Sequence, residues 1–418
     1  MERLTVRSHP KHSVPLVTAG GADVLLPNRR MLKRLIAITA LALLLPLQTL
    51  AQSHSAFPID ISAGPAPRPV MADRSTRLVY ELHLTNFSAN PIELLALDVF
   101  GDDRSTPLAS YQGEGLEKLL VAVGPTDSVG RVRAIGGGRS VVIFLDLTLP
   151  SRMQSPAALR HRFSLSISRK RDGSGGTIEN MVHGPVVAVV QEAPPVFRSP
   201  LRGSGWIAFN SLGTETHRRA LETVDGKARI AQRFAIDWVR LGADGCLFHV
   251  DPKSNANFYS YGAEVLAVAD GRISDLKDGL PDNAGQNEEN TRNITLDNIV
   301  GNYLTVDLGR GRFALYAHLQ PGSLKVRLGD NVRTGQVLAR LGNSGNSDEP
   351  HLHFQLMDAN SPLASEGLPY ELETFTQLGV IDRIEALDAG KPWQPRAGEV
   401  PIIHRHEIPF DDPVVIFP

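Results

Sequence analysis

The stretch Pro350-His351-Leu352-His353-Phe354 decides how the rest of the chain is interpreted. Side chains alternate between the two faces of a β-strand, so His351 and His353 are expected to project from one face, with Leu352 and Phe354 directed to the core. Neutral imidazole binds transition metals and exchanges protons near neutral pH. The stretch therefore predicts a strand with a chemically active face, and two surface histidines on an edge strand are the plainer alternative.

Composition favours a β-rich protein of two or three domains. The chain has 418 residues, 37 of them Gly and 29 Pro, with 42% hydrophobic and 6% aromatic residues. Such a chain is long enough to bury sizeable cores and has many turns. The single cysteine, Cys246, excludes an intrachain disulfide. Cys246 and His249 have a spacing seen in metal sites, but one such pair is weak and we predict an incidental loop cysteine.

The N-terminus has the pattern of an export signal. Basic residues at 29–34 precede an apolar run at 35–47 and a small-residue cleavage site before Gln52. We predict a signal peptide, Met31–Ala51, preceded by an upstream segment that is not translated; a retained membrane anchor is the alternative. Localisation is then periplasmic or secreted. The mature chain has 36 Lys and Arg against 43 Asp and Glu, so nucleic acid is not an expected partner. No later segment is apolar enough to cross a membrane.

Alternating strands and turns organise residues 52–190. Strands are expected at 77–85, 92–100, 141–149, 163–167 and 186–190. Short strands separated by turn signals predict an immunoglobulin-like β-sandwich. Its histidines, His83, His161 and His183, are expected at the surface.

The remaining sequence predicts a second β domain with a C-terminal extension. Pro-rich residues 191–205 are expected to form a linker. Strands are expected in residues 206–357, at 234–239, 264–268, 303–307, 313–318, 336–341 and 351–356, with a long polar loop at 278–297. Residues 358–418 are expected to pack on this antiparallel domain. His404 and His406 in the extension repeat the His-x-His spacing, and we interpret them as a solvated strand face.

Two further stretches supply partners for the opening histidines. Phe234, Ile236 and Trp238 are expected to face the core, which leaves Asp237 on the opposite face as a possible metal ligand or a surface ion-pair partner. The Gly342-Asn343-Ser344-Gly345-Asn346-Ser347 loop precedes His351, and its small residues would let a substrate approach the backbone.

Residues 206–357 resemble a known family through several short motifs in order. They are Ala267 to Ile273, Gly301-Asn302-Tyr303, Tyr316-Ala317-His318-Leu319, Gly329 to Val332, Gly335 to Leu338, Gly345-Asn346-Ser347 and Pro350 to Phe354. In this order they resemble the LytM/lysostaphin-type zinc endopeptidases of bacterial cell walls, which have the duplicated hybrid motif fold. The N-terminal domain lies outside the resemblance.

The resemblance implies one zinc ion per chain and roles for particular residues. Asp237 and His353 match two of the family's metal ligands. His318 and His351 match the histidines that act as general base and stabilise the tetrahedral intermediate. Substrate contacts are expected from Tyr316, Asn343 and Asn346.

The resemblance fails at Arg233, which occupies the position of the family's third ligand. Guanidinium stays protonated and has no lone pair for a metal. One hypothesis is that His217 replaces the ligand after a hairpin at Asp225-Gly226. The other is that zinc is lost or weak and Arg233 binds a substrate carboxylate.

Three functions follow from these hypotheses. The first is an exported zinc endopeptidase that hydrolyses stem or cross-bridge peptides of peptidoglycan. The second is a degenerate LytM-type module that binds cell wall or activates another hydrolase. The third is a binding scaffold whose main adhesive surface is the β-sandwich.

Overall fold

The computed structural model describes residues 57–418 except for 104, 124–133, 152, 171–174 and 287–292. The predicted signal peptide and part of the loop at 278–297 lie outside the described residues. Within the described part, no helix has the length and apolarity needed to span a bilayer. The described residues are mainly β, as the sequence predicts, and their helices are short: α2 (Gly113–Glu117), η1 (Asn255–Asn257) and α3 (Ile384–Asp388).

Two sheets enclose the N-terminal core. One has the order β1 (Ile59–Ala63), β3 (Ser75–Asn86), β8 (Ser140–Thr148) and β6 (Leu120–Ala122), with β2 (Pro69–Ala72) paired to β3. The other has the order β10 (Thr177–His183), β9 (Ala158–Ser168), β4 (Ile92–Phe100) and β5 (Ala109–Gln112), with β11 (Val187–Ala188) on β9 and β7 (Ala134–Ile135) on β4.

Alternation explains the core of this β-sandwich. Leu78, Tyr80 and Leu82 on β3 pack with Ile143 on β8 and Phe163 on β9, all fully buried. Burial of each large apolar side chain contributes about 1.5–3 kcal/mol. The predicted strands are therefore confirmed, whereas the immunoglobulin-like connection pattern stays a prediction.

Two histidines predicted at surfaces are buried, which corrects the sequence interpretation. His161 is 2% exposed, and its Nε2 lies 2.8 Å from the hydroxyl of Tyr80. His404 is 4% exposed and stacks on Phe375 with its Nδ1 3.1 Å from Glu407. A hydrogen-bond partner beside each ring offsets the cost of burying its polar atoms, and the local sequence does not show that partner.

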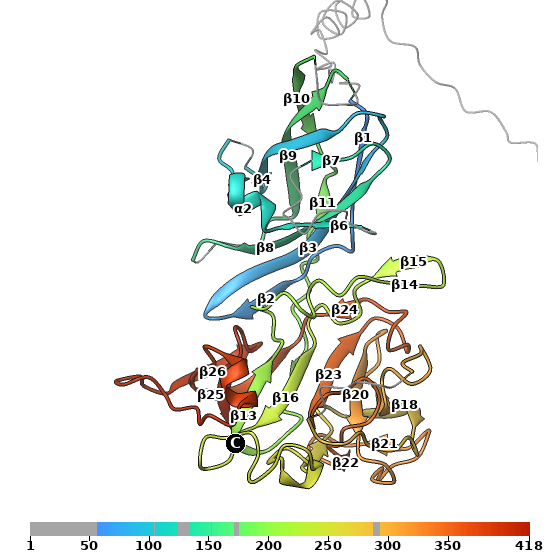
Figure 1. The fold of residues 1–418 in the computed structure, drawn as a ribbon, viewed down its shortest axis with the longest axis vertical. Coiled ribbons are helices and arrows are strands. Elements are labelled where there is room, and N and C mark those ends of the chain that lie inside the picture. The colour runs from blue at the N-terminus through green and yellow to red at the C-terminus, as the bar shows by residue number, and fades with distance from the viewer. Residues whose placement is uncertain (1–56, 104, 124–133, 152, 171–174, 287–292) are drawn as a thin grey trace, which may run out of the picture. The chain divides into compact units, whose positions relative to one another are not determined.

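A twelve-stranded sheet forms the second half of the described chain (Figure 1). Its order is β12 (Val196–Phe197), β25 (Glu371–Val380), β27 (Pro413–Phe417), β13 (Gly203–Phe209), β16 (Ile236–Arg240), β23 (Leu352–Met357), β20 (Phe313–Leu319), β19 (Asn302–Asp307), β18 (Gly271–Lys277) and β21 (Asn331–Val332), with β24 (Gly367–Leu368) on β23 and β26 (Ile402–Glu407) on β25. Two small two-stranded sheets accompany it: the hairpin of β14 (Glu222–Val224) with β15 (Lys227–Arg229), and β17 (Glu264–Leu266) with the distant β22 (Val337–Arg340).

This sheet includes segments that the sequence assigns to other units. Residues 191–205 were expected as a linker, yet they contain β12 and the start of β13. The C-terminal extension contributes β25, β26 and β27 to the sheet itself. Val70 and Val79 of the sandwich belong to the same hydrophobic cluster as Trp238 and Phe354, whereas the sandwich core is a separate cluster, so the two halves share a packed apolar contact.

Candidate metal centre

The pairing of two central strands places two of the predicted ligands side by side. Ile236 and Trp238 of β16 are fully buried, so Asp237 projects from the opposite face. In the antiparallel register of β16 and β23, Asp237 stands directly opposite His353. His353 Nδ1 lies 2.8 Å from Asp237 Oδ1. The sheet therefore fixes this pair through backbone hydrogen bonds.

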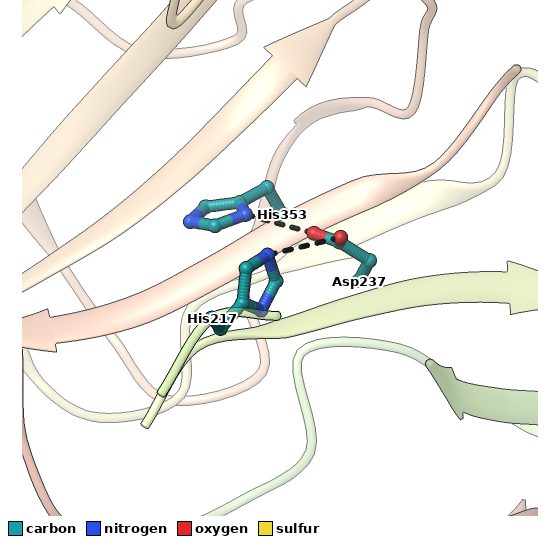
Figure 2. A group of neighbouring side chains, drawn as sticks. All are labelled: His217, Asp237 and His353. Atoms are coloured by element: carbon teal, nitrogen blue, oxygen red, sulfur yellow. Dashed lines mark hydrogen bonds and ion pairs between the residues drawn. The ribbon is translucent and has the colours of Figure 1, made fainter. Parts of the chain in front are cut away.

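His217 completes the group from the segment between β13 and β14. Its Nε2 lies 3.1 Å from Asp237 Oδ2, and Figure 2 shows both imidazole rings directed at the carboxylate. One nitrogen of each ring and one carboxylate oxygen lie within 4.8 Å of one another. A hairpin turns at Asp225-Gly226 between β14 and β15, where the sequence placed it.

Contacts at the far side of each ring fix its orientation and leave its other nitrogen directed at Asp237. Gln355 donates from its amide nitrogen to the carbonyl of Pro362 at 3.1 Å, which turns its oxygen toward His353 Nε2 at 2.9 Å. His217 Nδ1 lies 3.2 Å from the carbonyl of Ala235. The nitrogens that face Asp237 can donate to its carboxylate, and in a metal complex the same two nitrogens would supply their lone pairs to the ion.

Three electron-rich groups thus converge at one point, and this donor set fits a divalent cation. Two imidazole nitrogens and one carboxylate oxygen are a ligand set that zinc uses when one position remains open. Burial alone would raise the pKa of Asp237, but His217 and His351 beside it hold that pKa well below its ordinary value. The carboxylate is therefore ionised and able to bind a metal.

Two further histidines flank the cluster. The ring centroids of His318 and His351 are 4.7 Å apart, and His351 Nε2 lies 3.6 Å from Asp237 Oδ1. His318 Nδ1 lies 2.8 Å from the carbonyl of Ser344, and His351 Nδ1 lies 2.9 Å from that of Glu349. The Nδ1–H of each ring therefore donates to a backbone carbonyl, and its Nε2 faces the cavity.

Burial sets the protonation state of both flanking histidines. It lowers the pKa of His318 well below its ordinary value, and the neighbouring His351 and His353 lower it further. Burial also lowers the pKa of His351, although Asp237 partly opposes this. Both rings are consequently neutral proton acceptors at neutral pH. His318 has φ of 60°, a left-handed conformation that costs a non-glycine residue about 1–3 kcal/mol.

The cluster lies in a cavity of about 1000 Å³. Val300 and Leu315 line one part, and Ile384 and Asp388 of α3 line another, so the C-terminal extension forms a wall. Among the residues that the structure describes, the lining contains six carboxylates and no lysine or arginine: Glu222, Asp237, Asp348, Glu349, Glu385 and Asp388. The pKa of Glu349 is raised to about 8. Burial is the largest cause, followed by the nearby carboxylates of Asp388, Asp348 and Asp237.

Three of the predicted substrate-binding residues lie outside this cavity, which corrects the sequence interpretation. Arg233 is 5% exposed and donates to Glu81, Glu366 and the carbonyl of Gly367. These partners occupy its guanidinium, so it is not available to a substrate carboxylate.

The other two are structural residues. Tyr316 is fully buried and accepts a hydrogen bond from the backbone N–H of Val268. Asn343 is fully buried and donates to Asn255 and to the carbonyl of Ala284. Asn346 is exposed and lines the cavity, as expected for a substrate contact.

Sequence reasoning missed two residues that hold the ligands. Asn210 donates to Asp237 Oδ2 at 2.9 Å, and Gln355 orients His353 as described above. Gln355 is two residues after His353 on β23, so strand alternation already placed it on the same face. Asn210 follows β13, and its contact depends on the pairing of β13 with β16.

Comparisons with known proteins agree with this site. A family model described as peptidase family M23 matches residues 256–365, which include His318, His351 and His353. The murein hydrolase activator EnvC of Escherichia coli (strain K12) is 34% identical over 97 residues, or 23% of this chain and 18% of that protein. The chain thus spans less than a fifth of that relative's length. Residues 256–365 are thus similar to the M23 peptidase family.

Solved structures of M23 proteins also align with the chain. The catalytic domain of the prophage-encoded M23 protein EnpA from Enterococcus faecalis is 17% identical, with 42% of this chain and 92% of that one covered at a TM-score of 0.24. The catalytic domain of lysostaphin from Staphylococcus simulans is 23% identical, with 30% and 86% covered at a TM-score of 0.19. The M23 match begins after Asp237, so His217 and Asp237 are candidate ligands on the geometry of the structure.

Proposed function

We propose that the protein is an exported zinc metalloendopeptidase that hydrolyses peptide bonds in bacterial peptidoglycan. The convergence of His217, Asp237 and His353, with one nitrogen of each ring and a carboxylate oxygen within 4.8 Å of one another, is the observation that carries the proposal. The M23 domain supports the reaction class. The likeness to a murein hydrolase activator supports an assignment to the cell wall.

His217, Asp237 and His353 would hold the zinc ion. When bound, zinc polarises the scissile carbonyl and activates a water molecule for attack. The neutral Nε2 of His351 can accept the proton of the attacking water and then donate it to the leaving amine. His351 is the better base, because its protonated form lies 3.6 Å from the carboxylate of Asp237. His318 faces two other histidines, which disfavour its charged form.

The substrate is expected to lie along the cavity between the loop of Asn346 and α3. Asn346 offers amide groups at one side, and the wall from Ile384 to Ala389 limits the other. The carboxylates of the lining other than Asp237 and Glu349 favour peptides that carry an amino group near the scissile bond.

The test uses the purified full-length mature chain loaded with one equivalent of zinc. Release of soluble peptides from peptidoglycan, together with new amino groups, is expected, and His351→Ala should abolish it while zinc remains bound. Zinc-loaded protein that releases nothing from peptidoglycan or from Gly-rich peptides would contradict the proposal.

A second function has its own support. Arg233 occupies the position of a metal ligand that the resemblance implies, and the relative EnvC is a murein hydrolase activator. In that case the chain would stimulate a separate wall hydrolase, and His353→Ala would stimulate it equally well. Loss of all wall hydrolysis in His353→Ala favours the enzyme instead.

A further inference from the structure

His217 differs from the other two ligands in what holds it. Asp237 and His353 are fixed by the pairing of β16 with β23. His217 lies outside the named strands, in segment 214–221, whose local bonds are turns such as Arg219 N–H to the carbonyl of Glu215 at 3.0 Å. Sheet register therefore does not determine the position of His217, and its packing must.

Arg219, two residues after His217, joins this segment to the N-terminal sandwich. Its Nη2 donates to the carbonyl of Lys118 at 2.7 Å, just after α2. Its guanidinium also lies over the ring of Phe144 on β8, 5.6 Å from the ring centroid. An ion pair with Glu215 holds the guanidinium in this position from within the segment.

An apolar contact covers the same face of the sandwich. Val142 and Phe144 of β8 point away from the sandwich core and are 1% and 2% exposed. Ile230 packs against them, and Leu221 at the end of the segment joins the cluster. Neighbouring residues of β8, such as Ile143, face the sandwich interior instead. The outer face of β8 is thus a docking surface for the chain that flanks His217.

We propose that the β-sandwich completes the metal centre by holding segment 214–221, and that Arg219 is the positioning residue of the ligand His217. This inference rests on the proposed function, because it takes His217 as a zinc ligand. Loosening the contact moves His217 Nε2 away from Asp237, whereas the pair Asp237–His353 stays in place. The loss is therefore in zinc affinity and in the number of protein ligands.

The experiment measures the zinc Kd of full-length variants by competition with a chromophoric chelator. Arg219→Ala and Phe144→Ala are expected to weaken zinc binding about 10–100-fold, which is the usual effect of removing a residue that orients a metal ligand. Arg219→Lys can still donate to the carbonyl of Lys118 and should recover most of the affinity. With cobalt(II) in place of zinc, Arg219→Ala should show weaker visible absorption, because an imidazole ligand is replaced by water.

Ile143→Val is the matched control for general destabilisation. It thins the sandwich core one residue from Phe144 but leaves the docking face unchanged, so it should lower Tm and leave the zinc Kd unchanged. Equal zinc Kd values for wild type, Arg219→Ala and Phe144→Ala would overturn the inference. Wild-type protein that binds no zinc would instead overturn the proposed function.

Discussion

Arg233 donates two hydrogen bonds to the carboxylate of Glu81, at 2.8 and 3.0 Å, across 152 positions of sequence. Both side chains are almost completely buried, at 5% and 2% exposure, and Glu366 contacts the same guanidinium at 2.9 Å. The residue that stands in a ligand position by sequence therefore joins β3 of the sandwich to the chain just before β16. His217 contacts Asp237 in its place.

Arg233→Ala is expected to destabilise the fold by about 3–5 kcal/mol, because it leaves the buried carboxylates of Glu81 and Glu366 without a counter-charge. Urea denaturation of the apo protein measures this. Arg198→Ala is the control, since Arg198 is 66% exposed in its pair with Glu373 and should cost less than about 1 kcal/mol. Equal losses for the two variants would contradict a structural role for Arg233.

Gln355→Leu is expected to weaken zinc binding about 10–100-fold, because the ring of His353 loses the acceptor that fixes its tautomer. Gln355→Glu keeps an acceptor oxygen of similar size and should retain the affinity. Isothermal titration at constant pH measures both. If Leu and Glu at this position give the same affinity, Gln355 does not orient the ligand.

His351→Ala and His318→Ala are expected to lower the rate of peptide hydrolysis by about 10²–10⁴-fold with zinc still bound at one per chain. In the proposed mechanism His351 transfers the proton and His318 lies beside it, whereas the proposed zinc ligands are His217, Asp237 and His353. His183→Ala on the exposed end of β10 is the control and should retain full activity. Loss of zinc from His351→Ala or His318→Ala would assign that histidine to the metal instead.

Glu349 predicts a pH dependence of stability in the apo protein. Its pKa is raised from 4.5 to about 8 in the folded state, so the folded state binds more protons than the unfolded state between these values. The contribution of Glu349 to the free energy of unfolding is therefore fully present below about pH 4.5 and is lost as the pH rises toward 8. Each unit of raised pKa corresponds to about 1.4 kcal/mol.

Glu349→Gln removes this titration. The difference in Tm between the variant and the wild type is expected to widen from pH 5 to pH 8, with the variant the more stable at pH 8. Asp388→Asn should reduce the effect, because Asp388 is the second cause of the raised pKa. Parallel Tm curves for wild type and Glu349→Gln would show that the carboxyl of Glu349 titrates normally.

The strands and half of the site follow from sequence alone. Period-two alternation locates β3, β16 and β23, and it places Asp237 and His353 on one polar face. The remainder depends on contacts between distant segments. Glu81 is 152 residues before Arg233, so no local pattern could show that the arginine is paired.

The proposed third ligand was harder to predict for another reason. His217 is 20 residues before Asp237 on a segment without strand periodicity, and its contact with the carboxylate depends on the packing of distant segments. Tyr316 and Asn343 failed as predicted substrate contacts for a related reason. Their motifs are maintained by internal hydrogen bonds to Val268 and Asn255, and these bonds bury them.

The zinc content of the purified chain and of His217→Ala, after dialysis against metal-free buffer, tests the central claim most directly. The account predicts one zinc per wild-type chain, with X-ray absorption showing only nitrogen and oxygen ligands at about 2.0–2.2 Å, and less than a tenth as much zinc in His217→Ala. Wild-type protein without zinc, or a His217→Ala variant that keeps a full equivalent, would contradict the claim that His217, Asp237 and His353 form the metal centre.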